Sequence, residues 1–186
     1  MPSKLKPNQM KKLIFALVAL LLALDVTAAT VHKFATINAR YCAAGDTGAK
    51  QWKNRRTSFG NVINGYDFDV MGFQEVSGSA AGKGGMDDAM LTNIKTLFKK
   101  YTFKEWDRDG SAKKEYVVIA YKTSRYSLLD FGSFFISPTP GTASNGWDNQ
   151  GNGKHKRCIG WVKLQDKTTK EVFLFCLRPH QRRLDP

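Results

Sequence analysis

A glutamate at the end of an apolar segment is the most informative residue of this chain. Glu75 follows Phe68–Phe73, a segment with the length and composition of a buried strand. Because an unpaired charge is unstable near a protein interior, such a carboxylate needs a partner, and a bound cation is a strong one. Asn38 and Arg40 come at the end of another strand-like segment, Val31–Asn38. Asn38 and Glu75 together predict half of a metal and phosphate site at two strand ends.

Each of these side chains also has a simpler interpretation. A glutamate after an apolar strand is more often a solvated edge residue or the start of a helix. An asparagine after a strand often belongs to a turn, because its side chain bonds nearby backbone groups and tolerates unusual dihedral angles. Neither residue alone establishes a functional site.

Hydrophobic periodicity predicts the elements that would position these residues. The order of strand Val31–Asn38, helix Arg55–Tyr66 and strand Phe68–Glu75 favours an α/β fold, in which ligands bind at strand ends. A second helix, capped by Asp87, is expected to carry the apolar stripe of Leu91–Phe98. Further strands are predicted at Thr102–Trp106, Tyr116–Tyr121, Tyr126–Phe131, Arg157–Leu164 and Glu171–Cys176.

The first 28 residues have the order of a secretory signal peptide. Lysines precede the apolar run Leu13–Leu24, and the small residues Thr27–Ala29 follow it. The run has 12 residues, whereas a membrane-spanning helix needs roughly 20. A cleaved export signal is therefore favoured over an anchor, with a buried N-terminal helix as the alternative. We expect cleavage after Ala28 and a secreted or periplasmic protein.

Composition indicates one globular domain. The 186 residues are 42% hydrophobic and 24% charged, which excludes a disordered chain. The net charge of +13 suits a polyanionic partner such as nucleic acid, although surplus lysine also keeps many proteins in solution. Charge therefore does not select a function here.

The three cysteines, Cys42, Cys158 and Cys176, do not have the spacing of a zinc site. Cys158 and Cys176 flank a predicted hairpin, and the sequence leaves open whether they pair. Burial as small apolar side chains is expected for all three.

A set of short segments shares one pattern in chain order: Thr36–Asn38, Gly72–Val76, Glu115–Lys122, Phe131–Pro140, Gly146–Asp148 and Arg157–Val162. This ordered set resembles the endonuclease/exonuclease/phosphatase family, the deoxyribonuclease I-like group, and looks most like its exported bacterial branch. The resemblance implies a four-layer α/β sandwich, in which two packed β-sheets have helices outside. It also implies hydrolysis of phosphodiesters or phosphomonoesters with a divalent cation.

The resemblance assigns roles to three residues. Glu75 matches the metal-binding carboxylate, and Asn38 matches the asparagine that helps to position the metal and the phosphate; both are the expected catalytic residues. Arg157 matches an arginine that pairs with a phosphate oxygen. The implied cofactor is Mg²⁺, with Mn²⁺ or Ca²⁺ as alternatives. The implied partner is a phosphate-ester substrate, with nucleic acid, lipid head group and sugar phosphate left open. A monomer without a stable membrane anchor is expected.

The resemblance stops at the segment Cys176–Pro186. The family pattern continues there with an Asn-Thr-His-x-Asp segment and later supplies further Asp and His residues, which have no counterpart in this chain. We therefore expect a signal peptide at 1–28, the N-terminal portion of a phosphoesterase domain at 29–176 and a divergent tail at 177–186. The fold would then be incomplete and the activity impaired. The alternative function is an inactive truncated fragment with weak polyanion binding.

Overall fold

The computed structural model describes residues 8–12, 30–43, 45–78, 90–108, 115–144 and 156–178. The chain divides into two compact units, Met1–Val31 and His32–Pro186. In the first unit residues 8–12 are helical, and most of the expected signal peptide lies outside the described residues. Among the described residues, no helix has both the length and the apolar character needed to cross a membrane.

The second unit contains the helices and strands that the hydrophobic pattern predicts, with ends shifted by a few residues. The helices are the short 3-10 helix η1 (Gly48–Lys50), α2 (Trp52–Tyr66) and α3 (Met90–Leu97). The strands are β1 (Phe34–Asn38), β2 (Val70–Ser77), β3 (Tyr101–Asp107), β4 (Glu115–Lys122), β5 (Tyr126–Phe135), β6 (Cys158–Asp166) and β7 (Val172–Leu177). Helix η1 was not predicted, and the predicted cap Asp87 lies outside the described residues.

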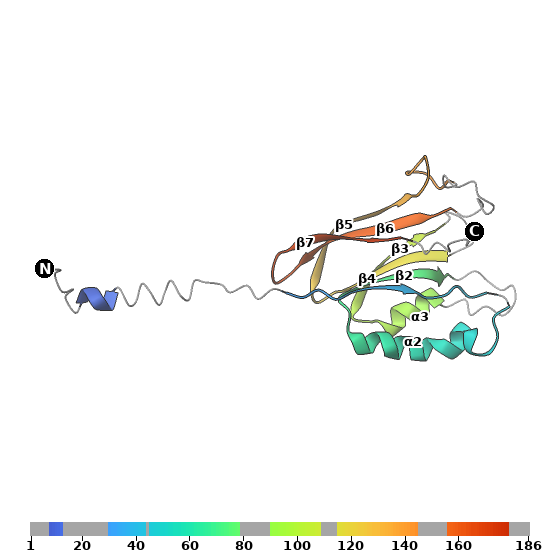
Figure 1. Cartoon of the computed structure of the whole chain (residues 1–186), viewed down its shortest axis with the longest axis horizontal. Coiled ribbons are helices and arrows are strands. Elements are labelled where there is room, and N and C mark those ends of the chain that lie inside the picture. The colour runs from blue at the N-terminus through green and yellow to red at the C-terminus, as the bar shows by residue number, and fades with distance from the viewer. Residues whose placement is uncertain are drawn as a thin grey trace, which may run out of the picture. The chain divides into compact units, whose positions relative to one another are not determined.

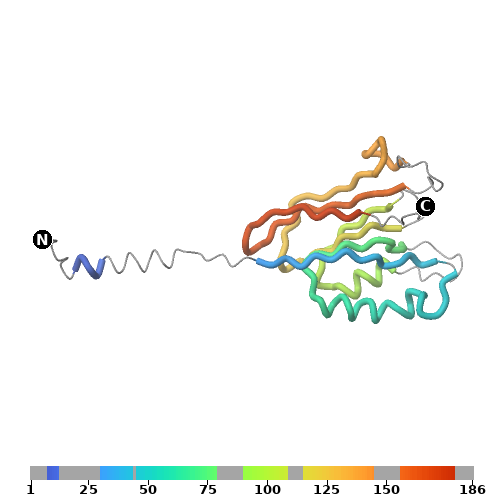
Figure 2. Tube along the Cα trace, in the orientation of Figure 1, coloured from blue at the N-terminus to red at the C-terminus, as the bar shows by residue number. Residues whose placement is uncertain are grey.

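The strands form two sheets (Figure 1). The first sheet has the order β1-β2-β4-β3, and only its β1-β2 pair is parallel. The second sheet has the order β5-β6-β7 and is antiparallel. Helices α2 and α3 lie on one side of the first sheet and the second sheet lies on the other, as the chain trace also shows (Figure 2).

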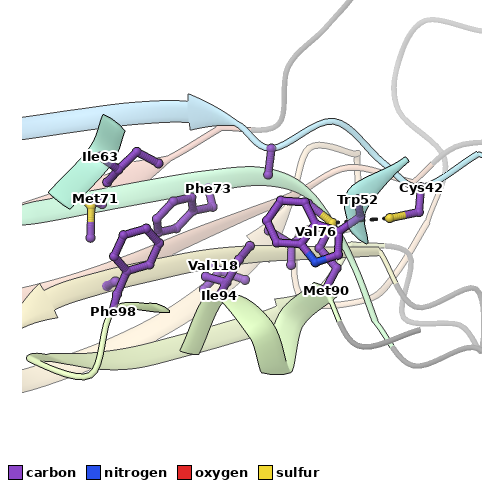
Figure 3. Close-up of a cluster of buried hydrophobic side chains, with 12 residues drawn as sticks. Cys42, Trp52, Ile63, Met71, Phe73, Val76, Met90, Ile94, Phe98 and Val118 are labelled. Atoms are coloured by element: carbon purple, nitrogen blue, oxygen red, sulfur yellow. Dashed lines mark hydrogen bonds between the residues drawn. The ribbon is translucent and has the colours of Figure 1, made fainter. Parts of the chain in front are cut away.

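Two hydrophobic clusters hold these layers together. One lies between the first sheet and the helices, where Phe73 stacks on Phe98 and packs with Ile94 (Figure 3). The other lies between the sheets and includes Ile119 of the first sheet and Val162 of the second. Both faces of the first sheet are therefore covered, which explains why β4 reads as a continuous apolar run. The predicted α/β class with two packed sheets is confirmed.

The cysteine expectations are partly wrong. Cys42 and Cys158 are buried, as predicted, but Cys176 is exposed, and none of these three described cysteines forms a disulfide with another. Cys176 is paired in register with Trp161, three positions along β6 from Cys158. Cys158 belongs to the buried face of β6, whereas Cys176 is exposed on β7, so the hairpin separates the two sulfur atoms.

Gly160 of β6 allows the two sheets to approach closely. A Cβ atom at Gly160 would overlap the ring of Trp106 on β3. We expect Gly160→Ala to lower the free energy of unfolding by about 1–3 kcal/mol, as overpacking does. Trp106→Leu in the same protein should recover part of the loss, measured by urea denaturation. Gly65→Ala is the control, because a Cβ atom added at Gly65 would have no neighbouring atom within 4 Å; equal stability of Gly160→Ala and wild type would contradict the prediction.

Candidate functional site

The carboxyl ends of β1 and β2 meet because these two strands are parallel and in register. Asn38, the last residue of β1, is paired with Gln74 of β2. The backbone N–H of Ala39 donates to the carbonyl of Gln74 at 2.9 Å, which extends the pairing beyond the end of β1. Side chains at these two strand ends are therefore close in space although they are far apart in sequence.

A β-bulge in β2 sets the direction of Glu75. Phe73 is paired with Val118 and Val76 with Tyr116, so two residues of β2 oppose a single residue of β4 between these pairs. Glu75 has a φ of 57°, the left-handed region that non-glycine residues rarely adopt. Phe73 and Val76 both pack in the cluster between the first sheet and the helices. Residues three positions apart normally point to opposite faces of a strand, so the bulge changes which face the side chains after it point to. Glu75 is thereby released from the apolar face that it would otherwise share with Phe73.

The released carboxylate contacts Asn38. The Nδ2 of Asn38 donates to the Oε1 of Glu75 at 3.0 Å, and the backbone N–H of Tyr41 donates to its Oε2 at 3.2 Å. The Oδ1 of Asn38 accepts from the backbone N–H of Arg40 at 2.8 Å. The amide is oriented by Arg40, and the carboxylate by Asn38 and Tyr41, so both side chains have defined positions.

The donor set of this site suits a hard cation that is shared with a phosphate. Glu75 is half-buried and Asn38 is exposed, so the pair faces solvent. Each carboxylate oxygen accepts one hydrogen bond from the described residues and has a second lone pair. Among all the described residues of the chain, no group of three or more His, Cys, Asp or Glu side chains is arranged to bind a metal. One carboxylate fits Mg²⁺, which keeps several waters and takes substrate phosphates as ligands.

Arg157 lies at the same end of the sandwich but is not joined to the pair. It directly precedes β6, and its backbone carbonyl accepts from the N–H of Ile136 at 2.8 Å. Because β6 and β7 are antiparallel, the start of β6 lies beside the end of β7. That end contacts β2, since the Nε2 of Gln74 reaches the carbonyl of Arg178 at 3.4 Å. No hydrogen bond between described residues connects Arg157 to Asn38 or Glu75, and its predicted role stays a prediction.

Two contributions at the site were not predicted. The N–H of Tyr41 that bonds Glu75 is a backbone group, so no residue type signals it. Gln74 is 8% exposed and ties β2 to β1 through a 2.7 Å bond from its Nε2 to the Oγ1 of Thr36. An amide beside the charged residue in an apolar strand was the available signal for Gln74.

Comparison with known proteins was informative only at the level of structure. No protein-family model matches the sequence, and no curated protein matches it. An endonuclease/exonuclease/phosphatase family protein from Bacteroides thetaiotaomicron is similar, with a TM-score of 0.66 and 27% identity over 79% of this chain and 50% of that one. A mannosyl-6-phosphatase from the same organism has a TM-score of 0.63 and 26% identity over 78% and 50%.

A family member from Bacteroides vulgatus has a TM-score of 0.66 at 24% identity, over 78% of this chain and 51% of that one, and supports the fold alone. This chain thus spans about half the length of the solved structures that it matches. The match covers 79% of this chain, and it agrees with the family pattern in the sequence. In its fold and its ordered motifs, the chain is similar to proteins of the endonuclease/exonuclease/phosphatase family.

Proposed function

We propose that this chain carries part of the active site of an exported phosphoesterase that uses a divalent cation, with Mg²⁺ as the preferred ion. The observation that carries the proposal is the contact between Asn38 and Glu75 at a strained bulge. Strained backbone persists only where the surrounding structure holds it, and it is concentrated at functional sites. Solved proteins with this fold include a mannosyl-6-phosphatase, which supports a phosphate ester as the substrate class.

Each residue has a defined task in this proposal. Glu75 would hold the cation through the carboxylate lone pairs that face solvent. Asn38 would keep the carboxylate in place through Nδ2, and its amide would orient the phosphate beside it. Arg157 would donate to a phosphate oxygen from the start of β6, since guanidinium groups match phosphate geometry.

When bound, the cation supplies positive charge that polarises the phosphate ester and stabilises charge on the leaving oxygen. The protein contributes the position of that charge. Because Asn38 and Tyr41 fix both oxygens of Glu75, the carboxylate needs little rearrangement when its ligands arrive. Such preorganisation is a main source of catalytic rate in phosphoryl transfer.

The test is hydrolysis of p-nitrophenyl phosphate and of bis(p-nitrophenyl) phosphate by the purified full chain, with and without Mg²⁺. Because the activity is expected to be impaired, we expect slow magnesium-dependent release of p-nitrophenol. Glu75→Ala should lower this rate by at least about 100-fold, a change of about 2.7 kcal/mol in the barrier. The two substrates separate monoester from diester hydrolysis. Glu105→Ala is the matched control, because Glu105 of β3 pairs with Lys95 of α3 and lies outside the site. Equal rates for wild type and Glu75→Ala would rule out the proposed site.

Export is a separate part of the proposal and rests on residues 1–28. Lysines, an apolar run and small residues in that order support cleavage after Ala28. The mature protein would then begin at Ala29. The mass of protein recovered from periplasm or medium tests this directly, and protein that keeps Leu13–Leu24 would contradict export by cleavage.

A further inference from the structure

Arg55, in the first turn of α2, donates to the backbone of the segment that follows β1. Its Nη1 contacts the carbonyl of Ala39 and its Nη2 contacts the carbonyl of Arg40, each at 2.6 Å. Its Nε donates to the carbonyl of Lys50 at 3.1 Å. All three nitrogen atoms of one guanidinium are therefore used on backbone carbonyls, and two of those carbonyls belong to adjacent peptide groups.

The same two peptide groups donate to the site. The carbonyl of Ala39 shares a planar peptide with the N–H of Arg40, which donates to the Oδ1 of Asn38. The carbonyl of Arg40 shares a peptide with the N–H of Tyr41, which donates to the Oε2 of Glu75. Because a trans peptide directs its two polar groups in opposite directions, Arg55 on one side fixes where both N–H groups point on the other.

The turn at Arg40 has a strained backbone, and the guanidinium of Arg55 that holds it is itself packed against a buried side chain. Arg40 has a φ of 57°, so the turn is held in the left-handed region without a glycine. The guanidinium of Arg55 lies over the ring of Trp52, 4.9 Å from its centre. Trp52 is 1% exposed within the cluster under the first sheet (Figure 3), and its Nε1 donates to the Oδ1 of Asn93 at 3.2 Å. The guanidinium thus rests on a side chain with little freedom to move.

We propose that Arg55 is a positioning residue of the site: it holds two peptide planes so that Asn38 and Glu75 are correctly oriented before the cation and the phosphate bind. The inference rests on the proposed function. A positive charge on the carbonyl side also polarises each peptide and strengthens the hydrogen bond that its N–H donates. Groups that orient metal ligands in this way commonly change metal affinity or activity by 10- to 100-fold when removed.

Arg55→Lys is the informative variant, because it keeps the charge but replaces a planar fork by a single ammonium that cannot bond both carbonyls in the same geometry. The matched control is Arg56→Lys, the next residue of α2, which is exposed and donates to the side chain of Asn93. Three quantities are measured on the full chain: the melting temperature in EDTA, amide hydrogen exchange at Arg40 and Tyr41 without metal, and the Mg²⁺ concentration for half-maximal hydrolysis of p-nitrophenyl phosphate.

For Arg55→Lys we expect amide exchange at Arg40 and Tyr41 to rise at least about tenfold and the half-maximal Mg²⁺ concentration to rise about 10- to 100-fold. The melting temperature in EDTA should stay close to that of wild type, and Arg56→Lys should change none of the three. Unchanged exchange, or faster exchange with an unchanged Mg²⁺ requirement, would overturn the positioning role.

The outcomes separate this inference from the proposed function. If wild type shows no magnesium-dependent hydrolysis, the proposed function fails and the inference fails with it. If wild type and Arg55→Lys respond equally to Mg²⁺, only the inference fails. Should Arg55→Lys not fold, Arg55→Gln is measured in the same way, since it keeps one donor near the carbonyls. Failure of both variants to fold would assign Arg55 to general stability and overturn the proposal.

Discussion

Replacing Glu75 by glycine is expected to abolish magnesium-dependent hydrolysis and yet to give a more stable protein than replacing it by alanine. Both variants remove the carboxylate that would hold the cation. They differ in the backbone, because Glu75 has a φ of 57° in the bulge of β2. Alanine keeps the steric strain of that conformation, whereas glycine adopts it freely. We expect Glu75→Gly to exceed Glu75→Ala by about 1 kcal/mol in the free energy of unfolding.

The comparison separates function from stability within a single position. Urea denaturation in EDTA gives the free energy of unfolding, and hydrolysis of p-nitrophenyl phosphate gives the activity. Lys170 provides a control, because it also has a positive φ, of 63°, in the turn before β7. Lys170→Gly should show a similar stability gain over Lys170→Ala with full activity. Equal stability of the two Glu75 variants would show that the bulge stores no backbone strain.

The second large effect is expected at the other end of the sheets, from Arg125→Met. Arg125 joins the two sheets: its Nη1 contacts the Oδ2 of Asp69 at 2.7 Å, and its Nε contacts the Oδ2 of Asp166 at 2.9 Å. Asp69 is 4% exposed and Asp166 is 1% exposed. Removing the guanidinium leaves two buried carboxylates without their positively charged partner. Such a change typically lowers the free energy of unfolding by about 3–5 kcal/mol. We expect a loss of about 3 kcal/mol at pH 7, because Lys122 still pairs with Asp69.

This loss should depend on pH in a defined direction. Burial alone would raise the pKa of Asp166, but hydrogen bonds from Arg125 and from the backbone of Thr169 and Thr168 outweigh it and lower the pKa to about 2. Burial likewise opposes the hydrogen bonds from Lys33, Lys122 and Arg125 that lower the pKa of Asp69. A carboxyl whose pKa is lower in the folded protein stabilises it above the pKa of the unfolded chain, about 3.9. That stabilisation is lost as the pH falls from about 4 to about 2.

Urea denaturation of wild type and Arg125→Met at pH 7 and near pH 2.5 tests both statements. The difference between the two proteins should be largest at pH 7 and should shrink in acid, where the carboxylates become protonated. Asp166 alone should account for about 2 kcal/mol of the wild-type pH dependence, because a tenfold change in proton affinity corresponds to about 1.4 kcal/mol. Arg56→Met, at an exposed arginine of α2, is the control. A pH-independent difference would contradict the ionic origin of the effect.

The prediction of the elements from sequence succeeded because each element has a regular hydrophobic pattern. The interior of strand β4, Tyr116–Tyr121, reads as an apolar run because the helices cover one face of the first sheet and the second sheet covers the other. The turn after β6 was equally clear, since Asp166 accepts from the N–H groups of Thr168 and Thr169. Such hydrogen bonds join residues that are close in the sequence, so the turn can be predicted from a short stretch of residues.

The failures arose where contacts are distant in sequence. The exposure of Cys176 depends on which face of the β6-β7 hairpin is turned outward. The contribution of Arg55 could not be predicted, because its partners are backbone carbonyls that any residue type would supply. The charged cluster of Asp69, Arg125 and Asp166 was not predicted either, because its members come from three separate segments of the chain.

For the site itself, the sequence determined the candidate residues of the proposed function. A carboxylate at Glu75 and an amide at Asn38, each at the end of an apolar segment, are informative because their residue types and neighbours are unusual. Only the tertiary structure decided that the two side chains touch. The parallel pairing of β1 and β2 brings the strand ends together, and the bulge at Glu75 turns its carboxylate away from the helix-covered core. Register and bulges follow from packing across the sheet, which a linear pattern of residues does not encode.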